Sequence, residues 1–164
     1  MNRLIRIGSL AALAVASTLA IAQEGAVTKA ASQADADKAI AARQALFDQI
    51  KEANDPIAPM LRPNGPAVDT ALVAASAAKL AELAAKIPGA YLVDTRGFTG
   101  KTRAVDGIWA SQADFKAKSD ALVDAANAAA EAAKSGDAAA TRRSLAGIGR
   151  ACGSCHDAYR GPAL

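Results

Sequence analysis

Histidine, cysteine and aromatic side chains are scarce in this chain of 164 residues, which has one histidine, two cysteines and 4% aromatic residues. Two cysteines are too few for the disulfide framework of a small secreted domain. A single histidine leaves no second imidazole for the distal acid or base of a peroxidase, and no other catalytic constellation stands out, so we expect no enzymatic activity. Sustained alternation of β-branched and polar residues is also missing, which argues against a β-sheet protein.

The scarce residues are concentrated near the C-terminus, where Cys152, Cys155 and His156 form the sequence Cys-Gly-Ser-Cys-His. This is the attachment pattern of a c-type haem, in which the two thiols add to the haem vinyl groups and the histidine is an axial iron ligand. The alternatives are a redox-active cysteine pair, half of a zinc site or a chance match. A redox pair would need a surrounding βαβ pattern and a zinc site two further ligands, and the sequence offers neither. The pattern therefore predicts one covalent haem c.

Residues 1–22 are typical of a secretory signal, because Arg3 and Arg6 precede an apolar run that ends in a small-x-small pattern at Ala22. A retained membrane anchor is the alternative, but the apolar core is short for a span of about 20 residues. We expect cleavage, a periplasmic protein without membrane contact, and one domain over residues 23–164. Loss of Arg3 and Arg6 would leave 17 basic against 16 acidic residues, which gives no reason to expect nucleic-acid binding.

Four stretches rich in Ala, Leu, Lys, Asp and Glu carry apolar side chains at three- and four-residue steps, which predicts four amphipathic helices in an antiparallel bundle, an all-α fold. The helices are expected over 33–54, 67–87, 111–134 and 137–158. Their inward stripes are Ile40, Arg43, Leu46, Phe47 and Ile50; Val73, Ala77, Leu80, Ala84 and Ile87; Phe115, Leu122, Ala126 and Ala129; and Leu145, Ile148, Cys152, Cys155 and Tyr159.

The connections are unequal in length. Prolines in 55–66 predict a turn between the first two helices. The segment 88–110 is long for a loop, so we expect it to wrap the bundle or to hold short helical turns. Ser111 and Asp137 are the expected N-cap residues of the third and fourth helices.

The order of these features resembles the cytochrome c′ family, the class II c-type cytochromes, over essentially the whole mature chain. The matching residues are Arg43, Gln44 and Phe47, a proline-containing turn, Gly107-Ile108-Trp109 and Phe115, and Cys152, Cys155, His156, Tyr159 and Arg160. The resemblance implies a four-helix bundle with a covalently attached haem near the C-terminus. It also implies a cofactor-binding set of Arg43, Gln44, Phe47, Trp109, Tyr159 and Arg160, beside the attachment residues Cys152 and Cys155 and the ligand His156.

Within this family, low-spin members carry a ligating methionine four residues after the arginine of the first helix, and this chain has Phe47 there. The resemblance thus implies a high-spin, five-coordinate iron with Phe47 over its open face, the alternative being that Phe47 is only a core residue. Whether Met60, which lies in the proline-containing turn, can ligate the iron stays open. Arg43 is expected to bind a haem propionate, or else a surface carboxylate.

Three further residues have two possible roles each. Trp109 packs against the haem edge or against the first helix, and Tyr159 lies on the porphyrin or completes the stripe of the last helix. Arg160 lies near the proximal face of the haem, as in the family, or is a solvated cation at a helix end.

An open iron site predicts binding of nitric oxide or carbon monoxide, and the alternative is a one-electron carrier between periplasmic redox proteins. Family members are commonly homodimers through the first two helices, where Ala74, Ala75, Ala78 and Ala85 would permit close approach.

Overall fold

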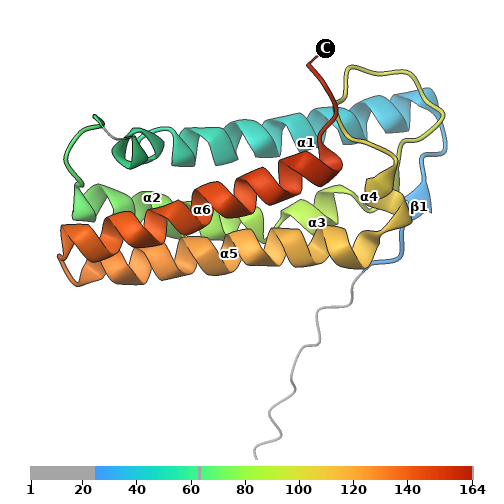
Figure 1. Cartoon of the computed structure of the whole chain (residues 1–164). Helices are drawn as coiled ribbons and strands as arrows, with labels where there is room; N and C mark the ends of the chain where they lie inside the picture. The colour runs from blue at the N-terminus through green and yellow to red at the C-terminus, as the bar shows by residue number, and fades with distance from the viewer. Residues whose placement is uncertain (1–24, 63, 164) are drawn as a thin grey trace, which may run out of the picture.

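The computed structural model describes residues 25–62 and 64–163, which form a bundle of four long helices (Figure 1). The expected signal peptide, residues 1–22, lies outside the described residues. The long helices are α1 (Gln33–Asn54), α2 (Thr70–Ala84), α5 (Gln112–Lys134) and α6 (Ala138–Tyr159). They run up and down in succession, so the predicted all-α, antiparallel four-helix architecture is confirmed.

Short elements join the long helices and hold the N-terminal segment. They are the 3₁₀ helix η1 (Ala58–Leu61), the helical turns α3 (Ile87–Ala90) and α4 (Gly107–Ala110), and the strands β1 (Thr28–Lys29) and β2 (Val93–Asp94). The two strands pair in parallel, with Thr28 opposite Val93. The segment 88–110 therefore contains short helical turns, as predicted, and also a strand that the sequence did not indicate.

Helix packing is uneven around the bundle. α5 makes extensive contacts with both α2 and α6. α1 packs mainly on α2 and also contacts α3 and β2. η1 reaches across to α6. α6 thus has α5 on one side and the connection that follows α1 on the other.

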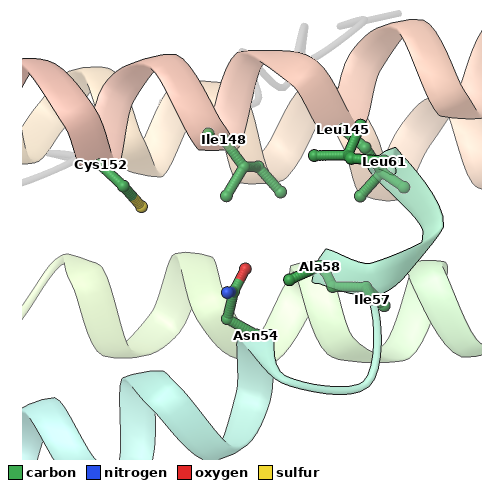
Figure 2. A pocket seen from close by; sticks show the side chains of 8 residues that line it. Asn54, Ile57, Ala58, Leu61, Leu145, Ile148 and Cys152 are labelled. Atoms are coloured by element: carbon green, nitrogen blue, oxygen red, sulfur yellow. The ribbon is translucent and has the colours of Figure 1, made fainter. Parts of the chain in front are cut away.

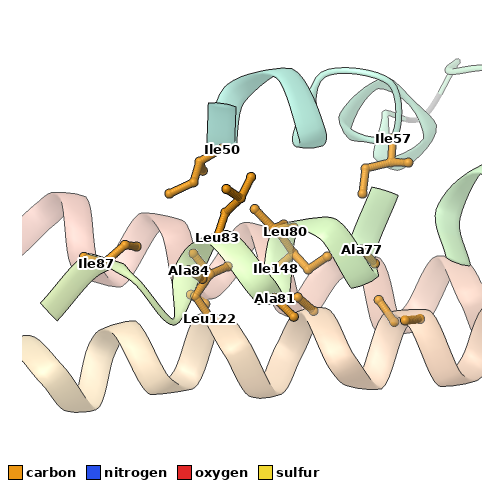
Figure 3. Close-up of a cluster of buried hydrophobic side chains, with 14 of the residues drawn as sticks. Ile50, Ile57, Ala77, Leu80, Ala81, Leu83, Ala84, Ile87, Leu122 and Ile148 are labelled. Atoms are coloured by element: carbon orange, nitrogen blue, oxygen red, sulfur yellow. The ribbon is translucent and has the colours of Figure 1, made fainter. Parts of the chain in front are cut away.

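Most of the predicted stripe residues lie in the core, together with residues of the connections such as Ile57, Tyr91 and Ile108. Figure 3 shows the apolar side chains of α2, α5 and α6 converging below the end of α1. All five predicted positions of α2 and α3 and all four of α5 are buried, and on α1 Phe47 is half-buried while its four companions are buried. On α6 the two cysteines are half-buried, and Leu145, Ile148 and Tyr159 are buried.

The second helix is shorter than the predicted range 67–87. Asp69 caps its start by accepting a hydrogen bond from the N–H of Leu72, so the helix begins at Thr70. It ends at Ala84 because Pro88 has no N–H to donate to the carbonyl four residues earlier, and Ile87 instead opens α3.

The two N-cap predictions have different outcomes. Asp137 caps α6, since its Oδ1 accepts the backbone N–H groups of Ala139 (2.8 Å) and Ala140 (3.0 Å). Ser111 occupies the N-cap position of α5, but within the described residues its side chain caps no backbone N–H.

Candidate haem site

The last two turns of α6 bring Cys152, Cys155 and His156 together. Both cysteines are free and half-buried, and His156 is exposed. Desolvation raises the pKa of both thiols, so they are protonated near neutral pH. Among residues 25–62 and 64–163, no cluster of three or more His, Cys, Asp or Glu residues could hold a metal ion.

An apolar cavity of about 100 Å³ lies between α6 and the end of α1 (Figure 2). Its lining comprises Asn54, Ile57, Ala58, Leu61, Leu145, Ile148, Gly149 and Cys152. Cys152 points its sulfur toward the space between the helices, as the figure shows. A covalently held porphyrin needs two thiols, an imidazole for the iron and apolar surroundings for the ring. The half-buried thiols, the accessible imidazole and the neighbouring apolar side chains meet these needs.

His156 contacts Arg160 one helical turn further on, where an Arg160 Nη1 N–H donates to His156 Nδ1 at 3.1 Å. Partial desolvation by the helix face lowers the pKa of His156, although the residue as a whole is exposed, and the charges of Arg160 and Arg103 lower it further. The imidazole is therefore held in the neutral form that a metal ligand needs. Arg160 also ends α6: its backbone N–H makes the last helical hydrogen bond, to the carbonyl of His156 at 3.0 Å, and its own backbone is extended.

Arg43 is almost completely buried, with 3% of its surface exposed. Its guanidinium donates to the carbonyl oxygens of Ala90 (2.9 Å) and Val93 and to the hydroxyl of Thr95 (3.0 Å). The alternative of a surface carboxylate partner is therefore wrong, because the side chain points inward to the segment after α2. These bonds use three of the five guanidinium N–H groups, so the propionate contact stays a prediction.

Trp109 contacts Arg43 of the first helix, which is one of its two predicted positions, and the contact with the haem edge stays a prediction. The Arg43 guanidinium lies over the rings of Tyr91 and Trp109, 4.6 and 5.2 Å from their centroids, and the indole N–H donates to the Tyr91 carbonyl at 3.0 Å. The contacts of Arg43 and Trp109 thus hold the connection 88–110 against α1.

Phe47 and Gln44 lie on α1 at different depths. Phe47 is half-buried and packs against the core cluster. Gln44 is exposed, and its amide donates to the Lys101 carbonyl at 2.7 Å. Met60 lies on η1 with only 4% of its surface exposed, so it is a core residue.

Tyr159 completes the buried stripe of α6 and makes a contact that sequence reasoning missed. Its hydroxyl donates to Asp114 Oδ2 at 2.5 Å, and its ring meets Phe115 edge-on at 5.2 Å between centroids. Tyr91 was missed as well, because it lies in a connection with no periodicity. The contact of Asp114 could have been suspected from its position in the first turn of α5, next to the predicted core residue Phe115.

A four-helix bundle whose last helix carries a Cys-x-x-Cys-His sequence defines the class of bundle-type c cytochromes. The family model described as Cytochrome C' matches residues 38–160. The chain belongs to the cytochrome c′ family.

Relatives of known sequence agree with this assignment. The chain is 36% identical over 121 residues to cytochrome c′ of Rhodopseudomonas palustris, which covers 74% of this chain and 80% of the relative. It is 40% identical over 90 residues to cytochrome c′ of Pararhodospirillum photometricum, covering 52% and 71%.

Solved structures are similar over most of the fold. Cytochrome c prime from Shewanella frigidimarina is 32% identical, with a TM-score of 0.67 over 80% of this chain and 98% of that one. A nitric oxide complex of a mutant cytochrome c prime from Alcaligenes xylosoxidans is 29% identical, with a TM-score of 0.64 and the same coverage. A carbon monoxide-bound variant of that protein matches equally well.

Proposed function

We propose that this cytochrome c′ attaches one haem through Cys152 and Cys155, with His156 as the axial ligand, and binds nitric oxide or carbon monoxide on the opposite side. Support for attachment comes from the two free, half-buried thiols, which lie one turn apart on α6 beside the exposed imidazole of His156. Support for gas binding comes from the nitric oxide and carbon monoxide complexes of the Alcaligenes xylosoxidans protein.

The observation that carries gas binding is the identity of residue 47. When bound, the haem iron supplies a coordination position for a diatomic molecule. The phenyl ring of Phe47 has no donor atom to fill that position, and no N–H or O–H to stabilise bound oxygen. The ring is half-buried against the core, and beside the iron it would present an apolar surface that disfavours water and anions relative to a small uncharged molecule.

Electron transfer between periplasmic proteins is the second candidate function. A five-coordinate iron can change its redox state, but a strong sixth ligand would favour fast transfer, and Met60 is the methionine of the described residues that could supply one. Met60 is buried in the core on η1, where it packs among apolar side chains. Ligation by Met60 would require this packing to be given up, which favours gas binding over a methionine-ligated carrier.

Two measurements on the purified protein test this function. Intact-mass analysis after denaturation should give the mature chain plus one haem, and Cys152→Ser together with Cys155→Ser should abolish the added mass. Equilibrium titration of the reduced protein should then show one carbon monoxide or nitric oxide bound per haem. Absence of covalent haem would overturn the attachment, and a haem-loaded protein that binds neither gas would overturn the function.

Export and assembly are further parts of the proposal. The sequence of residues 1–22 supports a periplasmic location, and within residues 25–62 and 64–163 no helix is both long and apolar enough to cross a bilayer. A homodimer through α1 and α2 is supported by Leu72, a large apolar side chain on α2 that is 38% exposed beside the exposed Ala75.

A further inference from the structure

Four of the six aromatic residues in the chain form one continuous row. Ring centroids are 6.1 Å apart from Trp109 to Tyr91, 4.8 Å from Tyr91 to Phe115, and 5.2 Å from Phe115 to Tyr159. Trp109 is half-buried, and the other three are buried. The row therefore leads from the surface into the core, where it ends on α6.

The inner end of the row lies beside the haem-attachment motif. Cys155 lies one helical turn before Tyr159 on α6, and both pack against the same core. Indole and phenol side chains lose one electron far more readily than a benzyl side chain does. Trp109, Tyr91 and Tyr159 are thus the redox-capable members, and Phe115 is a packed bridge between the two tyrosines.

The charges at the two ends of the row differ. The guanidinium groups of Arg43 and Arg96 lie over Trp109, 5.2 and 5.8 Å from its centroid, and Arg43 lies 4.6 Å over Tyr91. Asp94 balances the charge of Arg96 through an ion pair at 2.7 Å, whereas the hydrogen bonds of Arg43 go to neutral acceptors. Arg43 is thus the main charge that would repel a radical cation on Trp109.

At the other end, the Tyr159 hydroxyl donates to Asp114 Oδ2 at 2.5 Å, and Lys118 Nζ lies 3.9 Å from the same oxygen. The hydrogen-bonded carboxylate still offers Tyr159 a proton acceptor, which Trp109 lacks, because the indole N–H donates to a backbone carbonyl. This difference favours an oxidising equivalent on Tyr159 over one on Trp109.

The Tyr159 to Asp114 hydrogen bond also provides a place for the phenolic proton. This bond is the main reason that the pKa of Tyr159 rises to about 12, so the phenol stays protonated at neutral pH. Removing an electron makes a phenol strongly acidic, and the carboxylate is already in hydrogen-bond contact to receive its proton. The positive charge of Arg43 lies against the ring of Tyr91 and would destabilise a radical there. Tyr91 therefore suits the role of an intermediate in the electron transfer better than that of its end point.

We propose that Tyr159, paired with Asp114, is a redox-active tyrosine that terminates a relay from Trp109 through Tyr91. A small one-electron radical oxidant takes an electron from the Trp109 indole and becomes its anion. One electron from Tyr159 then restores Trp109 by way of Tyr91, while the phenolic proton moves to Asp114 Oδ2. The products are neutral Trp109, a neutral Tyr159 radical and a protonated Asp114.

The relay can be tested directly because the chain contains one tryptophan and two tyrosines. In the haem-loaded ferric protein, dibromide radical anion generated by pulse radiolysis should oxidise Trp109. Decay of the indole radical absorption should then match the rise of tyrosyl radical absorption, at a rate independent of protein concentration. An indole radical that decays only by bimolecular reaction, without a tyrosyl radical, would overturn the proposal.

Variants test the two members of the end point, Tyr159 and Asp114. Tyr159→Phe keeps the ring, and should lower the tyrosyl radical yield roughly tenfold, equivalent to a change of about 1.4 kcal/mol. Asp114→Asn keeps an acceptor oxygen but is a poor base, and should slow transfer by a similar factor. Asp120→Asn removes an exposed carboxylate of the same helix and should leave the rate unchanged. An unchanged yield in the Tyr159 variant, or equal rates in the two Asp variants, would contradict the assignment.

Discussion

The residue that decides between gas binding and electron transfer is Phe47. It occupies the position, four residues after Arg43, at which low-spin relatives have a ligating methionine. Its phenyl ring is half-buried and packs on the core, so it fills space without offering a lone pair to a metal. A change of side chain here should therefore change the coordination of the iron more than the stability of the bundle.

Replacing Phe47 with methionine should convert the haem to a low-spin form, because a thioether is a competent axial ligand. The optical spectrum should sharpen, and the affinity for carbon monoxide should fall by roughly tenfold, a cost of about 1.4 kcal/mol. Phe98→Met is the matched control, since Phe98 is half-buried in the connection near Lys29 and should leave the spectrum unchanged. An unchanged high-spin spectrum in the Phe47 variant would show that this residue does not face the iron.

Arg43 has a structural role that the sequence did not indicate. Its buried guanidinium bonds to Ala90, Val93 and Thr95, so Arg43→Ala should leave buried carbonyls without donors and cost roughly 3 kcal/mol in the free energy of unfolding. Arg43→Lys should recover only part of this loss, because an ammonium cannot reproduce the planar fork.

Urea denaturation of the haem-loaded protein, followed by circular dichroism, measures the effect of Arg43. Lys38→Ala, an exposed position on the same helix, should change stability by less than about 0.5 kcal/mol. Amide hydrogen exchange should accelerate selectively in residues 90–95 of the Arg43→Ala variant. If exchange there is unaffected, the arginine acts mainly on the haem and not on the connection.

At the scale of elements, helix periodicity predicted most of the fold. The first helix was predicted as 33–54 and is observed over the same residues, because capping and amphipathic spacing are local properties. The strands β1 and β2 were not predictable, since each has two residues and pairs only through a contact between Thr28 and Val93 that the sequence does not encode locally.

The site was predictable to the extent that it lies in one motif. Cys152, Cys155 and His156 are adjacent in the sequence and lie together on α6. The contacts of Arg43 and Tyr159 could not be derived, because their partners are 47 and 45 residues away. Partners so distant in sequence are determined by how the helices pack and not by any local pattern.

The N-cap of α6 gives a prediction with a pH dependence. Hydrogen bonds from the N–H groups of Ala140 and Ala139 lower the pKa of Asp137 below its usual 3.8. Its contribution to stability is therefore complete at neutral pH and is lost as the pH falls through the depressed value in the folded state. Asp137→Ala should lower the melting temperature by a few degrees at neutral pH.

Asp137→Asn is the matched variant, because asparagine also caps well but carries no charge. Thermal melts between neutral pH and about pH 2 should show that this variant lacks part of the acid-induced loss of stability seen in the wild type. Identical pH profiles for the two proteins would contradict the role of the Asp137 carboxylate at the start of α6.

At the scale of the whole molecule, the exposed apolar surface bears on assembly. Among the described residues, Val27 and Leu72 are the large hydrophobic side chains with the greatest exposure, at 37% and 38%. Leu72 lies on α2, whose neighbouring outward positions are small alanines that allow another helix to approach closely. This face is the one that we propose for the dimer.

Leu72→Glu should shift the protein toward the monomer, because a carboxylate would be desolvated in the interface. Analytical ultracentrifugation over a range of concentrations measures the equilibrium. Val27→Glu is the control, since Val27 is equally exposed but lies before α1, and it should leave the dimer intact. A wild-type protein that is monomeric at all concentrations would contradict the proposed interface.

The most direct test of the central claim is the optical spectrum of the haem-loaded protein, first ferric and then reduced, with no added ligand. An iron held by His156 on one side and covered by Phe47 on the other should give a broad, high-spin spectrum. A sharp low-spin spectrum, with a methionine-to-iron charge-transfer band in the ferric state, would instead identify Met60 as a ligand and contradict the open site.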